Sequence, residues 1–327
     1  KGVYWAIDQI KVRSKKVITS WYQEFLAGAE IVVNDVTIKK GSADDKVLIN
    51  EKEVDLKVSL ISDDNAEIAE DGLYFIGAGL NVTYKNSQNK NKVLINDSPT
   101  GEKPVVTCTN TITLNGTSLI CKNVALKLNE NATYRFLTIN TNNAPYVAFD
   151  GCNLEVPSTA TQNAFCYAST AVAINSFTLH KSKIKIDKST EYNIISVGKD
   201  NFVNFNSISV ENTIFYGNNA STFKLFGVNN GNTTNAGIGS LVLRNTTFLN
   251  MHYAGYGIVN GDISTMIVKN NIIYADNNNN NVTVFRKRGN SSASLQATDG
   301  EVADNIGYII GDFYLNLWQG DTPPLEN

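Results

Sequence analysis

The sequence predicts an all-β solenoid of stacked coils, and two observations lead to this prediction. In a short recurring pattern, apolar residues alternate with variable ones, a residue that is usually Asn follows, and another apolar residue comes three positions later. A second run of strand-like residues follows each copy by about 13 residues. Two patterns that repeat together along one chain are typical of a repeat architecture.

The position that is usually Asn, here called the anchor, marks each coil. The anchors are Asn123, Gly151, Lys181, Asn212, Asn245 and Asn270. These six are spaced by 25 to 33 residues, and a worn copy is expected to end at Asn305. The alternation before each anchor predicts a strand with one face inward. Asn tolerates the left-handed backbone of a sharp bend, and stacked anchor amides are expected to form a hydrogen-bonded ladder.

The repeats predict one elongated domain with two less regular ends. Residues 93–312 are expected to form the coils, residues 1–92 a less regular N-terminal part that holds a cap and the first coils, and residues 313–327 a tail. Helical periodicity is weak, although residues 8–25 are compatible with a short helix. Leu243 lies two positions before an anchor and is therefore expected to be buried between coils.

Composition excludes several classes of protein. The formal net charge of −3 over 327 residues argues against a broad nucleic-acid-binding surface, which would need a basic excess. No apolar run is long enough for a transmembrane helix. The four cysteines lack metal-binding spacing; buried free thiols are expected, and disulfides are the alternative. Residues 1–18 show no apolar signal core, so we expect the mature form of an exported protein, either secreted, periplasmic or on the cell surface.

The anchor pattern also carries a family resemblance. The stretch Ile208-Ser-Val-Glu-Asn212-Thr-Ile-Phe215 and its copies over roughly residues 93–310 resemble the pectate-lyase-type, or pectin-lyase, fold. Residues 93–106 resemble the opening coils of exported proteins from polysaccharide-degrading gut bacteria. The resemblance implies a single-stranded, right-handed parallel β-helix and a polysaccharide partner, but it defines the chemistry only loosely.

The catalytic motifs of the enzymes on this fold are missing. The Trp-Ile-Asp-His strand that supplies calcium ligands in pectate lyases does not occur. Asp-Asp pairs occur only at 44–45 and 63–64, and Arg-x-Lys occurs only at 13–15, all before the clear repeats. A polygalacturonase-like hydrolase, which needs paired carboxylates at its site, is therefore excluded.

The residue before each anchor is expected to face outward and to form a charged column. In coil order this column, here called the charged ladder, holds Lys122, Asp150, His180, Glu211, Arg244 and Lys269. Neighbouring strands lie about 4.8 Å apart, so the part from Asp150 to Lys269 would span roughly 20 Å, enough for a few sugar units. As a lyase site, this column would neutralise uronate groups with its basic residues, bring Arg244 or Lys269 to the proton at C5, and hold a calcium ion between Asp150 and Glu211. The other interpretation is a solvated sheet face with ordinary ion pairs.

The second strand of each coil predicts an apolar outer column. If Phe136, Ile194, Leu225 and Ile258 face inward, the outward residues are Leu137, Cys166, Ile195, Phe226, Val259 and Phe285. Phe226 and Phe285 would then be candidates for an aromatic platform under sugar rings. The other interpretation is that a loop or the segment 314–318 covers this column.

These features predict a protein that binds an extracellular, acidic polysaccharide and has either no catalytic activity or only a weak one. The alternative is a polysaccharide lyase that acts through the charged ladder, and a third class is an adhesin or structural spike. No cofactor is required under the first prediction, and calcium is the one ion that the ladder could use. The oligomeric state and the identity of the glycan stay open.

Overall fold

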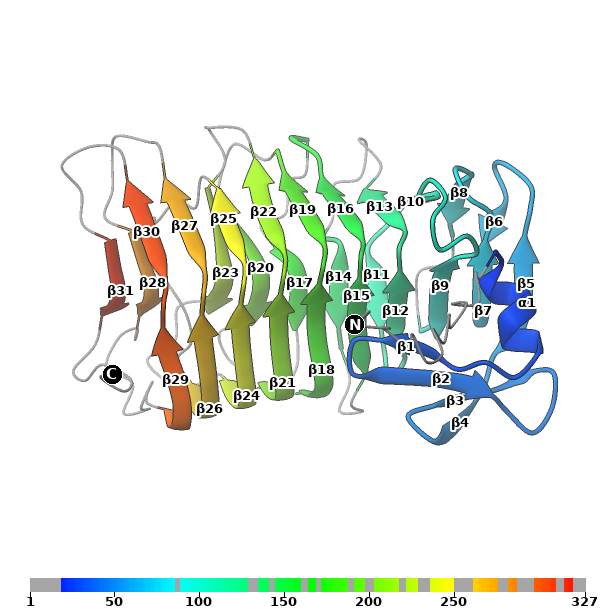
Figure 1. Cartoon of the computed structure of the whole chain (residues 1–327), viewed down its shortest axis with the longest axis horizontal. Coiled ribbons are helices and arrows are strands. Elements are labelled where there is room, and N and C mark those ends of the chain that lie inside the picture. The colour runs from blue at the N-terminus through cyan, green and yellow to red at the C-terminus, as the bar shows by residue number, and fades with distance from the viewer. Residues whose placement is uncertain are drawn as a thin grey trace, which may run out of the picture.

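The computed structural model shows a parallel β-helix built from three parallel sheets (Figure 1). It describes residues 19–85, 89–128, 135–140, 145–159, 164–168, 172–187, 191–197, 203–217, 222–228, 236–249, 261–275, 282–286, 297–309 and 315–319. The sequence prediction of an all-β solenoid with parallel coils is confirmed. None of the described helices is long and apolar enough to cross a membrane.

Two ten-stranded sheets run along the whole solenoid. The first sheet contains, in chain order, β5 (Lys57–Ile61), β7 (Gly72–Ile76), β9 (Lys92–Asn96), β12 (Leu119–Lys122), β15 (Tyr146–Asp150), β18 (Val172–His180), β21 (Val203–Glu211), β24 (Ala236–Arg244), β26 (Gly261–Lys269) and β29 (Ala297–Ala303). The second sheet contains β6 (Glu67–Ile68), β8 (Asn81–Tyr84), β10 (Val105–Cys108), β13 (Ala125–Leu128), β16 (Asn153–Val156), β19 (Lys183–Ile186), β22 (Ile214–Gly217), β25 (Thr247–Leu249), β27 (Ile272–Ala275) and β30 (Ile306–Ile309). The parallel coils therefore begin at Lys57, inside the part of the sequence predicted to be less regular.

The remaining strands form three smaller sheets. The third parallel sheet has five strands, β11 (Ile112–Leu114), β14 (Leu137–Ile139), β17 (Ala164–Ala168), β20 (Glu191–Val197) and β23 (Thr222–Val228). A parallel pair joins β28 (Val282–Arg286) to β31 (Leu315–Gln319). An N-terminal unit contains helix α1 (Trp21–Leu26) and an antiparallel sheet of β1 (Ile31–Val33), β2 (Val36–Lys40), β3 (Lys46–Ile49) and β4 (Lys52–Asp55).

Each predicted anchor forms the bend between a first-sheet strand and a second-sheet strand. The backbone angle φ is positive at all six, from 50° at Lys181 to 66° at Gly151. Asn and Gly tolerate this left-handed conformation, which is why they dominate the position. The predicted alignment of the anchors in successive coils is confirmed by the strand register. The worn copy is shifted by one residue, because Asp304 and not Asn305 has the positive φ, of 54°.

The anchors form the predicted amide ladder where three successive coils each have Asn at this position. Asn245 Nδ2 donates to Asn212 Oδ1 at 3.3 Å, and Asn270 Nδ2 donates to Asn245 Oδ1 at 3.2 Å. A second, buried polar column follows one residue later, and the sequence analysis missed it. There Thr246 N donates to Asn271 Oδ1 at 3.0 Å, and Asn271 N donates to Asn305 Oδ1 at 3.1 Å. These side chains satisfy backbone groups that the bend leaves without a ladder partner.

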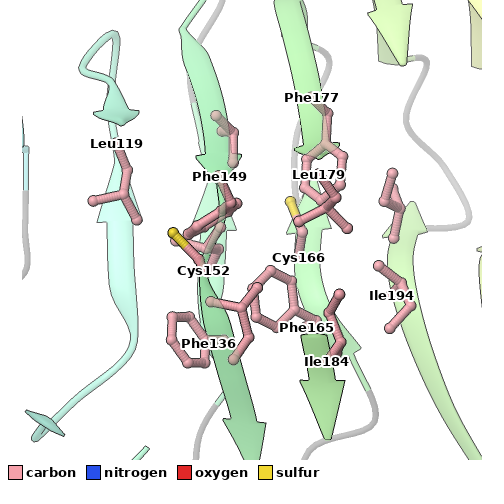
Figure 2. Packing of buried hydrophobic residues seen from close by; sticks show 14 of the residues in the cluster. Leu119, Phe136, Phe149, Cys152, Phe165, Cys166, Phe177, Leu179, Ile184 and Ile194 are labelled. Atoms are coloured by element: carbon pink, nitrogen blue, oxygen red, sulfur yellow. The ribbon is translucent and has the colours of Figure 1, made fainter. Parts of the chain in front are cut away.

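The interior of the coils is one continuous apolar cluster (Figure 2). It includes third-sheet residues that were predicted to face outward. Leu137, Cys166 and Ile195 pair in register and are buried in this cluster, so the prediction that they form an outer column is wrong. Phe136 and Phe165 are buried as well, with ring centroids 4.6 Å apart. Phe136 directly precedes β14, where the chain turns. Because the alternation of facing ends at such a turn, two consecutive residues are buried there.

A lysine also lies inside the first coils. Lys92 has no exposed surface, and its ammonium group lies 3.8 Å from the centroid of the Tyr84 ring. Its Nζ donates to the carbonyl oxygens of Lys85 at 2.8 Å and Ile68 at 3.3 Å. Burial disfavours the charged form and lowers the pKa of Lys92 to about 8.

The N-terminal unit covers the outer face of the first sheet at one end of the solenoid (Figure 1). Phe25 of α1 and the inward residues of β1–β3 pack on outward residues of the sheet, namely Leu73, Phe75, Val93, Ile95, Ile120 and Ala148. The cover ends at β18, where Asn34 Nδ2 donates to the carbonyl oxygen of Phe149 at 3.1 Å and to Thr178 Oγ1 at 2.9 Å. This unit therefore divides the outer face of the first sheet into a covered part and a part beyond it.

Candidate functional site

The structure places the charged ladder in one column on the outer face of the first sheet. The register pairs Lys122 with Asp150, Asp150 with His180, and His180 with Glu211. It continues from Glu211 to Arg244 and from Arg244 to Lys269. The next residue of the column is Ala303, where the charges end. Neighbouring side chains of this column are therefore about 4.8 Å apart along the solenoid.

The first two residues of the column belong to the contact with the N-terminal unit. Lys122 Nζ donates to the carbonyl oxygen of Val32 at 2.6 Å and to Asp150 Oδ2 at 2.7 Å. Asp150 is only 8% exposed, and Lys181 Nζ lies 3.7 Å from its other oxygen. This carboxylate is thus neutralised and occupied, and its contacts hold the N-terminal unit on the coils.

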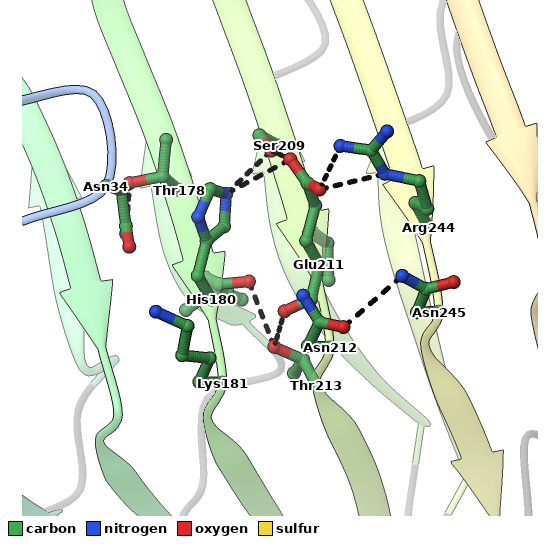
Figure 3. Close-up of polar contacts among 12 residues, drawn as sticks. Asn34, Thr178, His180, Lys181, Ser209, Glu211, Asn212, Thr213, Arg244 and Asn245 are labelled. Carbon is green, nitrogen blue, oxygen red and sulfur yellow. Dashed lines mark hydrogen bonds and ion pairs between the residues drawn. The ribbon is translucent and has the colours of Figure 1, made fainter. Parts of the chain in front are cut away.

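The centre of the column is a hydrogen-bonded network (Figure 3). His180 Nε2 lies 2.7 Å from Ser209 Oγ, and Ser209 Oγ donates to Glu211 Oε1 at 2.9 Å. Arg244 donates to Glu211 Oε2 from Nε at 2.9 Å and from its terminal nitrogen at 2.5 Å. Burial acts to raise the pKa of Glu211, but the hydrogen bonds from Arg244 and Ser209 outweigh it and lower this pKa. Glu211 is therefore an ionised carboxylate, which accepts hydrogen bonds and donates none.

This network determines the protonation of His180. Ser209 has one hydroxyl hydrogen, which goes to the Glu211 carboxylate, so Nε2 of His180 must donate to the Ser209 oxygen. Burial lowers the pKa of His180, although Glu211, Asp150 and Asp35 act in the opposite direction. The imidazole is consequently neutral at neutral pH, with its hydrogen on Nε2 and a lone pair on Nδ1.

The sequence analysis missed Ser209, which links His180 to Glu211. It lies two residues before Glu211 on the same strand and so faces the same side of the sheet. Period-two alternation would have placed it there, but a serine at one outward position is not distinctive by itself.

Asp150 and Glu211, the predicted ligands of a cation, do not lie on neighbouring strands. The strand β18 lies between their strands, and each carboxylate is paired with a basic residue, Lys122 and Arg244 respectively. No group of three or more His, Cys, Asp or Glu residues that could hold a metal occurs in the described part of the chain. Calcium binding by this pair stays a prediction, and it would require both ion pairs to open.

The other predicted residues lie farther along the solenoid. Lys269 is about one third exposed, and its Nζ lies 3.9 Å from an oxygen of Asp304. Phe226 pairs with Ile195 in the third sheet, and Phe285 pairs with Trp318. The side chains of Phe226 and Phe285 lie outside the described residues, as do Val259 and Ile258, so the aromatic platform stays a prediction.

Comparison with known proteins finds no match among protein-family models, curated proteins or solved structures.

Proposed function

We propose that the protein binds an extended, acidic polysaccharide outside the cell, along the outer face of β18, β21, β24 and β26. The observation that carries this proposal is the row of polar groups beyond the N-terminal unit. On successive strands about 4.8 Å apart, this row presents the imidazole of His180, the carboxylate of Glu211, the guanidinium of Arg244 and the ammonium group of Lys269. The resemblance of the anchor pattern to the pectin-lyase fold supports a polysaccharide as the partner.

The charges of this row favour an acidic ligand. Glu211 is already neutralised by Arg244, whose side chain is 45% exposed and has further N–H donors that can reach a ligand. The Arg244–Glu211 pair has no net charge, so Arg244 offers hydrogen-bond donors, and Lys269 on the adjacent strand supplies a positive charge for a neighbouring sugar unit. Hydroxyl-bearing residues on the same face, such as Ser240 and Thr265, pair across the same two strands and suit hydrogen bonds to sugar hydroxyls.

Replacement of Arg244 by Ala is expected to weaken binding of acidic polysaccharides by about two- to fivefold, the range for one partly exposed charge contact. The difference should shrink as salt concentration rises, because salt screens exposed charges. Titration calorimetry with polygalacturonate and alginate fragments measures this loss. Arg244→Lys should retain most of the affinity, and Lys57→Ala, an exposed residue of the first coil, should retain all of it. If the wild-type protein and Arg244→Ala bind the acidic fragments equally well at low salt, this face is not the binding site.

A second candidate function, polysaccharide lyase, is favoured by the neutral imidazole of His180. In β-elimination, a base removes the proton at C5 of a uronate, the C4–O bond breaks, and a C4–C5 double bond forms. The leaving sugar oxygen takes a proton from water. The Nδ1 lone pair of His180 can accept the C5 proton, while Arg244 and Lys269 neutralise the uronate carboxylate. Arg244, which donates to Glu211, is a cation in this scheme and not the base.

Under the lyase candidate, His180→Gln is expected to lower turnover by about 10²- to 10⁴-fold while leaving binding nearly unchanged. The ultraviolet absorbance of the unsaturated product reports turnover on a panel of uronate polysaccharides, with and without calcium. Ser209→Ala, which frees the imidazole to rotate, should lower turnover less than His180→Gln. If the wild-type protein gives no unsaturated product on the whole panel, the lyase candidate is rejected and the binding proposal stands.

A further inference from the structure

A groove on the outer face of the second sheet lies away from the charged ladder. It has a volume of about 250 Å³ and is lined by residues of β13, β16, β19 and β22. The register aligns one row of its residues, Lys127, Glu155, Lys185 and Tyr216, across these four strands. A parallel row holds Asn153, Lys183 and Ile214. Both rows face outward, because the residues between them, such as Ile184, are buried in the core.

The groove has an excess of positive charge although the whole chain has a net charge of −3. Lys185 is neutralised by Glu155 at 3.2 Å and Asp187 at 2.5 Å. Lys127 and Lys183 are exposed, and neither forms an ion pair within the part of the chain that the structure describes. Two ammonium groups are therefore available to an anionic ligand, on strands β13 and β19, which lie roughly twice the 4.8 Å strand spacing apart.

A third lysine adds to this charge at the edge of the groove. Lys103 Nζ donates to Asn153 Oδ1 at 2.9 Å and so directs the Asn153 side chain along the groove. Burial lowers the pKa of Lys103, and the positive charge of Lys183 lowers it further. An anion placed between these lysines would relieve their mutual repulsion.

One end of the groove is apolar. Tyr216 is half-buried, and Ile214 beside it is 38% exposed. The column of Ile214 continues through Thr247 to Ile272, which is 46% exposed, and Ile306, which is 63% exposed. An aromatic ring beside exposed aliphatic side chains is an unusual surface for solvent alone and suits the apolar face of a sugar ring.

We propose that this groove is a second carbohydrate site, which binds an acidic sugar residue of an extended glycan. Tyr216 stacks under the sugar ring, and Lys127 and Lys183 pair with carboxylates of neighbouring units. The choice of a sugar as the ligand rests on the proposed function, whereas the position of the site and its preference for an anion rest on the groove itself. Lys185 and Glu155 form an ion pair between adjacent strands of the groove and add no net charge to the site.

The test uses oligogalacturonates and their methyl esters, which have the same sugar backbone without the charge. The wild-type protein is expected to bind the charged probe more tightly. The double variant Lys127→Ala/Lys183→Ala should lose roughly tenfold in affinity for the charged probe and nothing for the ester, because two exposed charge contacts are removed. Tyr216→Ala should lose roughly tenfold for both probes, since stacking does not depend on charge. The double variant Lys52→Ala/Lys57→Ala, two exposed lysines near the N-terminal unit, is the matched control.

Wild-type affinity of the Lys127→Ala/Lys183→Ala variant for the charged probe would overturn the proposal, as would a wild-type protein that binds neither probe. Comparison with Arg244→Ala separates this site from the first-sheet face. If Arg244→Ala weakens binding and the groove variants do not, the groove is not a site while the proposed function stands. If only the groove variants weaken binding, the glycan lies on the second sheet and the first-sheet face is dismissed.

Discussion

Alkaline pH is expected to unfold this protein through its buried thiols. Cys108, Cys121, Cys152 and Cys166 are free and fully buried in the coils. Burial raises the pKa of Cys108, Cys152 and Cys166 to about 12, and it raises the pKa of Cys121 well above its ordinary value. In the unfolded chain the same thiols ionise near pH 9.

These pKa shifts determine that rising pH lowers the free energy of unfolding. The folded-state pKa is raised above the unfolded value, so each thiol contributes stability that is fully present below about pH 9 and is lost as the pH rises from 9 towards 12. Each thiol should lower the free energy of unfolding by about 1.4 kcal/mol per pH unit in this range. Lys92 acts in the opposite direction, because its folded pKa of about 8 is depressed from 10.5. Between pH 9 and 10.5 it offsets about one thiol.

Urea unfolding between pH 7 and 11 under reducing conditions measures this loss. Cys166→Ala is the cleanest variant, since burial is the only cause of the pKa shift at that residue. Its smaller side chain costs stability equally at every pH, but the slope above pH 9 should become shallower by about 1.4 kcal/mol per pH unit. A slope identical to that of the wild-type protein would show that the thiols can ionise without unfolding the coils.

Replacement of Leu243 by Ala is expected to lower the free energy of unfolding by about 2–5 kcal/mol, the usual range for a buried Leu. Leu243 is 1% exposed and belongs to the main apolar cluster. It pairs with Val210 on one side and Val268 on the other, so the substitution leaves a cavity between three coils. Parallel strands on both sides restrict the collapse that would fill it.

The neighbouring residue provides a matched control for Leu243. Val242 lies on the same strand but faces outward and is half-buried, so Val242→Ala should cost less than about 1 kcal/mol. Denaturant unfolding of both variants measures the difference. A loss below about 0.5 kcal/mol for Leu243→Ala, or a larger loss for Val242→Ala, would contradict the assignment of the inward face.

The repeat and its bends were predictable from the sequence because they depend on local chemistry. An alternating strand with one buried face must show a period of two, and a bend with positive φ selects Asn or Gly. The register of the charged ladder follows from the same rule, since a residue next to an anchor has the same place in every coil. For this reason the repeat pattern alone aligns Asp150, His180, Glu211, Arg244 and Lys269.

The state of those aligned side chains depends on contacts that the repeat does not encode. The repeat pattern places Asp150 and Glu211 in one column with basic residues, but their ion-pair partners depend on the packing of the folded chain. Asp150 is held by Lys122 under the N-terminal unit, and Glu211 is held by Arg244 and Ser209. The cover arises from long-range packing between residues 21–56 and the first sheet, and no local pattern specifies such packing.

The prediction of which third-sheet residues face outward was wrong for a related physical reason. Alternation assigns a side chain to one of two faces only while the strand stays straight, and β14 begins directly after a bend of the chain at Phe136. At such a turn Phe136 and Leu137 both reach the interior. The sequence thus determined the coils, their bends and the outward column, whose chemistry is repeated locally. The tertiary structure decided which charges are neutralised, which face is covered and which corner residues fill the core, because these depend on where distant segments pack.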